Sequence, residues 1–191
     1  MVAVCDVTEY LGAQGGQNPV DNSPAAVVTR LILPVSGSGR NITTDNWYSS
    51  VPLALSLKRN HRLTLVGTIR KNRKEVPLEF VRTQQRELYS TMFGFTDDLT
   101  ILSYKAKSNR VVTAISSMHH DATINHESGD RRKPESITFY NTTKGGVDTH
   151  DQLAATYSVA RRTRRWPMVI FYAVLNTAIT ISNNASNIIL K

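Results

Sequence analysis

Two carboxylates lie just after two glycines in the stretch TKGGVDTHDQ, residues 143–152. Gly145 and Gly146 adopt positive φ angles without a steric penalty, so they predict a sharp turn before Asp148. A helix that begins near Asp148 places Asp151, three residues further on, on the same face. Such a pair is either an N-terminal cap with a second acidic residue in the first helical turn, or a pair of metal ligands. These residues alone leave both interpretations open.

A third carboxylate, Asp45, ends the β-branched segment of residues 41–44. Chemistry on a phosphodiester uses acidic groups of this kind, because carboxylates can hold two divalent cations about 3.5–4 Å apart beside the attacking and leaving oxygens. Aspartate suits Mg²⁺, which prefers small, hard oxygen ligands. Asp45 and Asp148 are therefore the candidate metal ligands, although their spacing in the sequence does not require them to meet.

Two basic segments supply the candidate DNA contacts. The segment ARRTRRWP places cations that can pair with phosphates just before Trp166. Its arginines are Arg161, Arg162, Arg164 and Arg165. The segment RKNRK adds Lys71 and Arg73. For both segments the alternative is a solvated, charged surface. We expect Trp166 itself to pack into the core.

Two further groups of residues could have a functional role: the aromatic pair after Asp45 and a histidine-rich stretch. Trp47 and Tyr48 follow Asp45, and we expect both rings to fasten its loop to the core, with stacking on bases as the alternative. The stretch MHHDATINH offers four potential transition-metal ligands, but their spacing matches no standard closed site. They are His119, His120, Asp121 and His126.

Composition narrows the class of protein. The 191 residues suit one domain with room for an inserted subdomain, and 23 Lys and Arg against 15 Asp and Glu give a net charge of +8. This charge favours an anionic partner, with nucleic acid as the first candidate. The single cysteine, Cys5, excludes an internal disulfide framework and a zinc finger within the chain. No apolar run is long enough to predict a membrane span, so we expect an intracellular protein.

The predicted elements alternate between strand and helix. Strands are expected at residues 2–11, 41–44 and 62–70, and helices after Ser23-Pro24 and after Ser50. This order favours an α/β sheet whose ligands gather at the carboxyl ends of the strands. Short strand-like pieces between residues 72 and 134, including EFVRTQQ, predict a small antiparallel insertion. Helices are expected again at about 148–159 and 167–183.

Four motifs, in order along the chain, resemble those of piggyBac-type transposases. They are SGSGRNITTDNWYSSVPLA, LTLVGTIRKNRKEVP, YNTTKGGVDTHDQ and RRTRRWPMVIFYAVLN. The resemblance implies an RNase H-like mixed sheet with flanking helices, divided into residues 1–72, a β-rich insertion at 73–134, and 135–191. It also implies that Asp45 and Asp148 are two members of a catalytic acidic triad that holds two Mg²⁺ ions, and that Asp151 is an auxiliary carboxylate.

The family's first acidic residue lies on its first strand, which we expect to be missing here. Asp6 follows Cys5 as the family's first aspartate does, but it precedes YLGAQGG by too few residues. The segment VAVCDVTEYLG therefore matches the family's second strand, and the chain is expected to be a truncated copy that is inactive alone. The alternative is a deleted hairpin, which would make Asp6 catalytic.

The predicted function is thus that of a piggyBac-like transposase catalytic domain, which cleaves and transfers DNA strands with metal assistance. The resemblance implies transposon ends and target DNA as partners, a homodimer in the full-length family, and location in the nucleus. The alternative from another class is a domesticated or decayed DNA-binding protein without catalysis.

Overall fold

The computed structural model describes the backbone of residues 21–189, and the side chains of these residues other than 146–151, 153–154 and 180–189. The predicted strand at residues 2–11, which contains Asp6, lies outside the described residues. The chain divides into two compact units, Met1–Thr143 and Lys144–Lys191. Each unit is described by itself.

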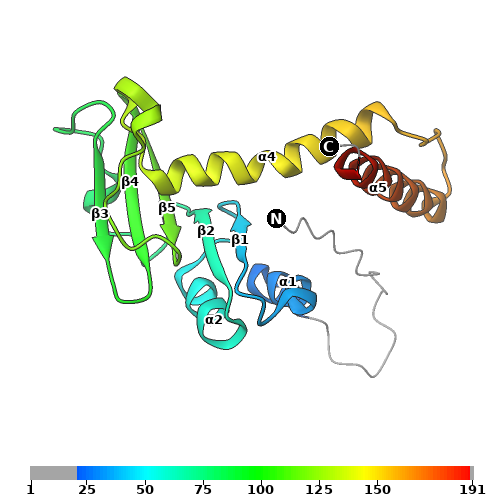
Figure 1. Cartoon of the computed structure of the whole chain (residues 1–191), viewed down its shortest axis with the longest axis horizontal. Coiled ribbons are helices and arrows are strands. Elements are labelled where there is room, and N and C mark those ends of the chain that lie inside the picture. Colours follow the sequence, from blue (N-terminus) through cyan, green and yellow to red (C-terminus); the bar gives the residue numbers. More distant parts are fainter. Residues whose placement is uncertain (1–20, 190–191) are drawn as a thin grey trace. The chain divides into compact units, whose positions relative to one another are not determined.

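The first unit is built on a mixed five-stranded sheet in the order β1-β2-β5-β4-β3 (Figure 1). The strands are β1 (Asn41–Thr44), β2 (Thr64–Thr68), β3 (Thr91–Phe95), β4 (Thr100–Lys107) and β5 (Arg110–Ser116). β1 and β2 are parallel, and the other neighbouring strands are antiparallel. Because β5 pairs with β2, the sheet continues across the insertion boundary predicted at residue 73.

Two capped helices, α1 (Pro24–Leu31) and α2 (Val51–His61), cover one face of the sheet. The Ala26 N–H donates to Ser23 Oγ at 3.3 Å, and the Leu53 N–H donates to Ser50 Oγ at 3.3 Å. Both predicted helix starts are therefore confirmed. A short 3-10 helix, η1 (Leu33–Val35), follows α1. The aliphatic core on this face includes Val28, Ile32, Leu53, Leu57, Leu65 and Ile115.

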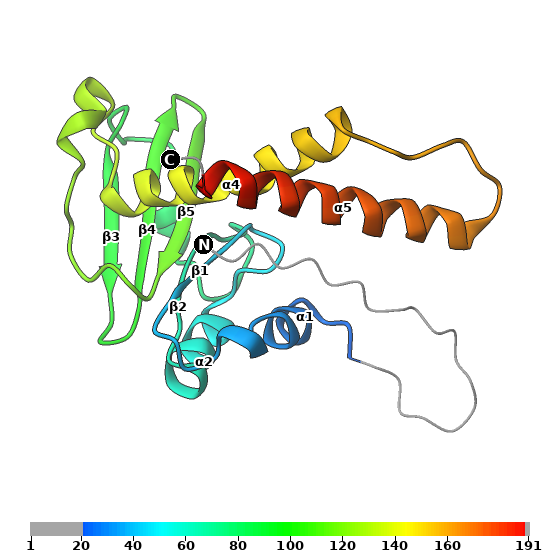
Figure 2. The ribbon, with the colours of Figure 1, turned by 45° about the vertical axis from the view of Figure 1, so that its right-hand side comes forward.

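The opposite face is covered by the first turns of α4 (Glu135–Thr156), which cross the sheet in Figure 2. Ile137 packs there with Leu102 and Ala114. Ala114 and its neighbour Ile115 point to opposite faces, as successive residues of a strand do. The sheet is thus enclosed between α1 and α2 on one side and the start of α4 on the other.

Two predicted elements are wrong. The segment EFVRTQQ, residues 79–85, was expected to be a strand, but its first three residues belong to the helical turn α3 (Leu78–Val81). Pro77 starts this turn, and Phe80 is buried against the core. The connecting segment before α4 forms a 3-10 turn, η2 (His126–Arg131).

The second wrong prediction concerns the start of α4, which precedes the double glycine instead of following it. Gly145 lies inside the helix and is not among the glycines with positive φ. A glycine inside a helix costs about 1 kcal/mol relative to alanine. Ile137 and Tyr140, which are 5% and 9% exposed, bury the first turns of the helix and offset that cost.

In the second unit, α5 (Trp166–Ile189) follows α4 after an extended connection. Trp166 is 73% exposed, so its predicted packing into a core is wrong. Within the described residues, neither α5 nor any other helix is long and apolar enough to cross a membrane.

Candidate active site

Asp45 stands at the carboxyl end of β1, in a tight turn that its own side chain closes. The N–H groups of Trp47 and Tyr48 donate to Asp45 Oδ1 at 3.0 and 3.3 Å. This side-chain-to-backbone turn is a common use of aspartate after a strand. The residue is exposed. Its carboxylate is thus held in one orientation while it remains open to solvent.

A buried hydroxyl supports this turn from the side of α2. Ser49 is fully buried, and its N–H and Oγ–H donate to the Asp45 carbonyl at 3.0 and 2.7 Å. Ser49 Oγ also lies 2.8 Å from Thr44 Oγ1. The neighbouring strand has Gly67 at this point, where a Cβ atom would lie 2.5 Å from the Thr44 carbonyl and would clash with Ser49 Oγ. Gly67 therefore permits the close approach that fixes the backbone of Asp45.

A chain of hydroxyl and amide groups links the two parallel strands to α4 within the first unit. Thr64 Oγ1 donates to Asn41 Oδ1 at 3.0 Å, and Asn41 Nδ2 donates to Thr43 Oγ1 at 3.3 Å. Thr43 Oγ1 then donates to Thr143 Oγ1 at 2.9 Å. Thr143 Oγ1 in turn bonds to the Phe139 carbonyl at 2.9 Å. We call these four linked side chains, Thr64, Asn41, Thr43 and Thr143, the polar relay.

The polar relay was missed by sequence reasoning, although the sequence contains a signal for it. Asn41 and Thr43 alternate with Ile42 and Thr44, so a strand at residues 41–44 has one face with only polar side chains. The strand was predicted, but nothing local shows that Thr143 packs on that face. The relay depends on a contact between residues 100 positions apart.

Asp148 and Asp151 lie on α4, and their side chains are outside the described residues. The predicted spacing on one helix face is compatible with the helical backbone of both positions. The alternative role for Asp148, an N-terminal cap, is excluded because α4 begins at Glu135. The shared metal site of Asp45 and Asp148 stays a prediction.

The two aromatic residues after Asp45 behave differently from each other. Tyr48 packs against the core, as predicted. Trp47 is 54% exposed, so its predicted role as a core anchor is wrong. The Arg70 guanidinium carbon instead lies 4.3 Å from the centroid of the Trp47 ring.

The basic candidates lie in both units. Lys71 is exposed and Arg73 is half-buried, shortly after β2. Arg161, Arg162, Arg164 and Arg165 are all exposed between α4 and α5. Other cations are already paired with acidic groups: Lys58 and Arg59 lie 3.2 and 2.9 Å from the carboxylate of Asp98.

The potential ligands of the histidine-rich stretch do not gather around one point among the described side chains. His119 Nδ1 lies 2.8 Å from Ser116 Oγ, and its ring packs edge-on against Phe139 at a centroid distance of 5.5 Å. Burial lowers the pKa of His119 below its ordinary value of 6.5. Among the side chains that the structure describes, no three His, Cys, Asp or Glu residues gather closely enough to hold an ion.

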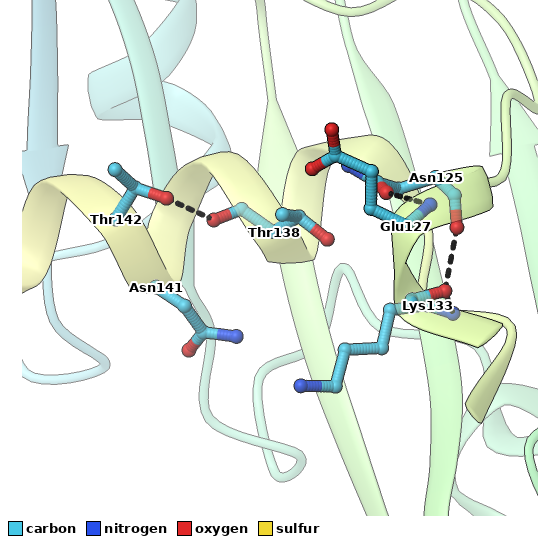
Figure 3. Close-up of a pocket in the computed structure, with 7 residues that line it drawn as sticks. Asn125, Glu127, Lys133, Thr138, Asn141 and Thr142 are labelled. Carbon is cyan, nitrogen blue, oxygen red and sulfur yellow. Dashed lines mark hydrogen bonds between the residues drawn. The ribbon is translucent and has the colours of Figure 1, made fainter. Parts of the chain in front are cut away.

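A polar hollow of about 360 Å³ lies between η2 and α4 (Figure 3). Its lining includes Asn125, Glu127, Lys133, Thr138, Asn141 and Thr142. In Figure 3 the Lys133 side chain extends to the same side of α4 as the Asn141 amide, and the Glu127 carboxylate lies on the other side. Because both charge signs are present, the hollow shows no preference for an anion or a cation.

Residues 4–185 match the family model described as transposase IS4. The fold is similar to the cryo-EM structure of a piggyBac transposase synaptic complex with hairpin DNA, with a TM-score of 0.77 and 39% sequence identity. The match covers 92% of this chain and 38% of that chain. The sheet and its flanking helices are therefore the RNase H-like fold of a transposase catalytic domain.

Proposed function

The chain belongs to the transposase IS4 family and is a piggyBac-like transposase domain, and from this premise we propose that it cleaves and transfers DNA strands with the help of divalent metal ions. The observation that carries the proposal is the presentation of Asp45. Its side chain is exposed at the carboxyl end of β1, which pairs with β2 in parallel. Its backbone is fixed by a hydrogen bond from Ser49 Oγ–H to the Asp45 carbonyl. Ligands of α/β sheets gather at such strand ends.

The groups around Asp45 fit a magnesium ion. Asp45 Oδ1 accepts two backbone N–H groups, whereas no donor among the described residues lies within hydrogen-bond distance of Oδ2. One oxygen thus orients the carboxylate, and the other is available as a hard ligand of the kind that Mg²⁺ prefers. We propose Asp148 as the second ligand and Asp151 as an auxiliary carboxylate.

The residues of this chain would then have separate tasks in cleavage. Asp45 and Asp148 hold the ions, and the Asp45 turn keeps its carboxylate oriented without rearrangement during the reaction. Bound Mg²⁺ supplies positive charge that stabilises the attacking and leaving oxygens of the phosphodiester. Arg161, Arg162, Arg164, Arg165, Lys71 and Arg73 are proposed to contact the DNA backbone.

Strand cleavage is tested by nicking of a supercoiled plasmid in Mg²⁺ with a longer chain that also carries the family's first strand and its acidic residue. We expect Asp45→Asn and Asp148→Asn to lower the nicking rate about a hundred- to a thousandfold, because each removes several kcal/mol of charge stabilisation. Asp97→Asn, at an exposed site in the β3–β4 connection, is the matched control and should keep the rate. Nicking that survives Asp45→Asn contradicts the proposal. DNA binding by the longer, unsubstituted chain without nicking favours the non-catalytic alternative.

The proposed partner is DNA, and the solved relative is itself a complex with hairpin DNA. The net charge of +8 supports binding through phosphates, which is sequence-independent and weakens steeply with salt because counterions are released. Titration of unrelated duplexes at two salt concentrations measures this slope. Tight, salt-insensitive binding to one sequence contradicts it. The proposal has three remaining parts: transposon ends and target DNA as the partners, a homodimer, and location in the nucleus.

A further inference from the structure

The Trp47 ring is an unusual feature of the Asp45 turn. It is 54% exposed, although the adjacent Tyr48 packs against the core. A tryptophan that only fastened a loop would bury its ring, because burial of aromatic surface away from water stabilises the fold. The exposure of this ring therefore calls for a partner outside the core.

Arg70 covers one face of the ring. Its guanidinium carbon lies 4.3 Å from the ring centroid, which is the geometry of a cation–π contact. Trp47 follows β1 and Arg70 follows β2, and these strands are parallel, with Thr44 opposite Gly67. The ring and the cation thus meet beside the strand end that carries Asp45.

Backbone hydrogen bonds tie the ring to the candidate metal ligand. The Trp47 N–H donates to Asp45 Oδ1 at 3.0 Å, so the backbone that carries the indole and the carboxylate belong to one hydrogen-bonded turn. A molecule that stacks on Trp47 is therefore held within a few residues of the group proposed to act on a phosphodiester.

From this arrangement we propose that Trp47 and Arg70 form a stacking site for an unpaired nucleotide of DNA. The flat face of an exposed base matches the open surface of the indole, and its phosphate is attracted by the guanidinium. Bases inside a duplex are stacked on each other and do not offer a free face. The ligand is assigned as DNA on the basis of the proposed function, and the stacking site goes beyond it.

The test uses the intrinsic fluorescence of Trp47 in the 191-residue chain. The sequence has two tryptophans, so Trp166→Phe leaves Trp47 as the only indole. The probes are an oligothymidylate of about ten nucleotides, within the usual site size of single-strand binding, and an abasic oligonucleotide of the same length and charge. We expect the oligothymidylate to quench Trp47 fluorescence and the abasic strand and a blunt duplex not to do so.

Substitutions of the pair separate stacking from simple charge attraction. Trp47→Leu should weaken oligothymidylate binding about 5- to 100-fold, the range expected for loss of one base stack, and Trp47→Phe should recover part of the affinity. Arg70→Gln should weaken binding of both oligonucleotides. Thermal melting of each variant shows whether the fold is kept.

Three results would overturn the proposal: equal quenching by the abasic strand, equal quenching by the duplex, or unchanged oligothymidylate affinity in folded Trp47→Leu. Asp45→Asn in the longer chain used for nicking distinguishes this proposal from the proposed function, because it should lower the nicking rate about a hundred- to a thousandfold and leave quenching intact. Quenching without any nicking supports the stacking site and counts against the catalytic proposal. Nicking without quenching supports the catalytic proposal and counts against the stacking site.

Discussion

In the first unit, the two faces of the sheet differ in chemical character: one is packed with aliphatic side chains, and the other carries polar side chains at β1 and β2. Towards α1 and α2, Leu57, Leu65 and Ile115 are fully buried in an aliphatic core. Towards α4, β1 and β2 present the polar relay, whose members bond from strand to strand and then to the helix. Burial of apolar surface is non-directional, whereas hydrogen bonds specify geometry. The aliphatic core therefore supplies stability on the first face, and the polar relay fixes position near Asp45 on the second.

The largest effect on stability is expected on the aliphatic face. Leu57 has no exposed surface, so Leu57→Ala should lower the free energy of unfolding by about 2–5 kcal/mol. Leu78→Ala, at a side chain that is 72% exposed, is the control and should change it by less than about 0.5 kcal/mol. Urea denaturation measures both values. Similar losses in the two variants would contradict the role of the buried aliphatic core as the main source of stability.

Gly67 supports the Asp45 turn, and its substitution is expected to have the next largest effect. A Cβ atom there would lie 2.5 Å from the Thr44 carbonyl, so Gly67→Ala should cost about 1–3 kcal/mol and displace the turn. Gly145→Ala is the matched control, because a Cβ atom there meets nothing within 4 Å. In α4 that change should stabilise the chain by about 0.5–1 kcal/mol. The same chemical change should thus shift the melting temperature in opposite directions, and a fall in both variants would count against this account.

The polar relay should contribute less to stability than either of these sites. Thr43→Val and Thr143→Val should each lower the free energy of unfolding by about 1 kcal/mol, since each leaves a hydroxyl without its partner. The double variant should cost less than the sum of the two, because both remove one contact. Thr43→Ser and Thr143→Ser keep the hydroxyls and should be milder. Additive losses in the double-mutant cycle would show that the two threonines are not coupled.

The smallest effect is a dependence of stability on pH through His119. Burial lowers its pKa, with a further decrease from His120, while Glu135 and Asp121 oppose the shift. The unfolded chain therefore binds a proton more readily than the folded chain, so stability is complete above the ordinary pKa of 6.5 and falls as pH drops through the lowered value. His119→Asn does not titrate and keeps a polar group near Ser116. Its unfolding free energy should fall less than that of the unsubstituted chain below about pH 6.5, and an identical pH dependence would exclude His119 as the cause.

Elements with local signals were predictable from the sequence. Ser23 and Ser50 cap their helices as expected, and β1 matches its predicted residues. The start of α4 was mispredicted because the local preference of Gly145 for a turn is weaker than the burial of Ile137 and Tyr140 earlier in the same helix. Tertiary packing overrides local propensity in this way whenever one side of a helix is anchored.

The site was only partly predictable. Asp45 at a strand end follows from the sequence, but the support beneath it depends on Ser49 and Gly67, which meet across two elements. Gly67 did give a signal, since glycine inside a strand marks a close approach. The contact between Trp47 and Arg70 gave none, because it depends on which strand lies beside β1.

Paramagnetic broadening by Mn²⁺, a substitute for Mg²⁺, tests most directly whether Asp45 and Asp148 share a metal ion. In amide spectra of the 191-residue chain, substoichiometric Mn²⁺ should broaden the signals of residues 45–48 and 147–151 together. Asp45→Asn should remove the broadening in both segments, whereas Asp97→Asn should leave it unchanged. Broadening that remains at 147–151 in Asp45→Asn, or that never reaches residues 45–48, would contradict the shared site.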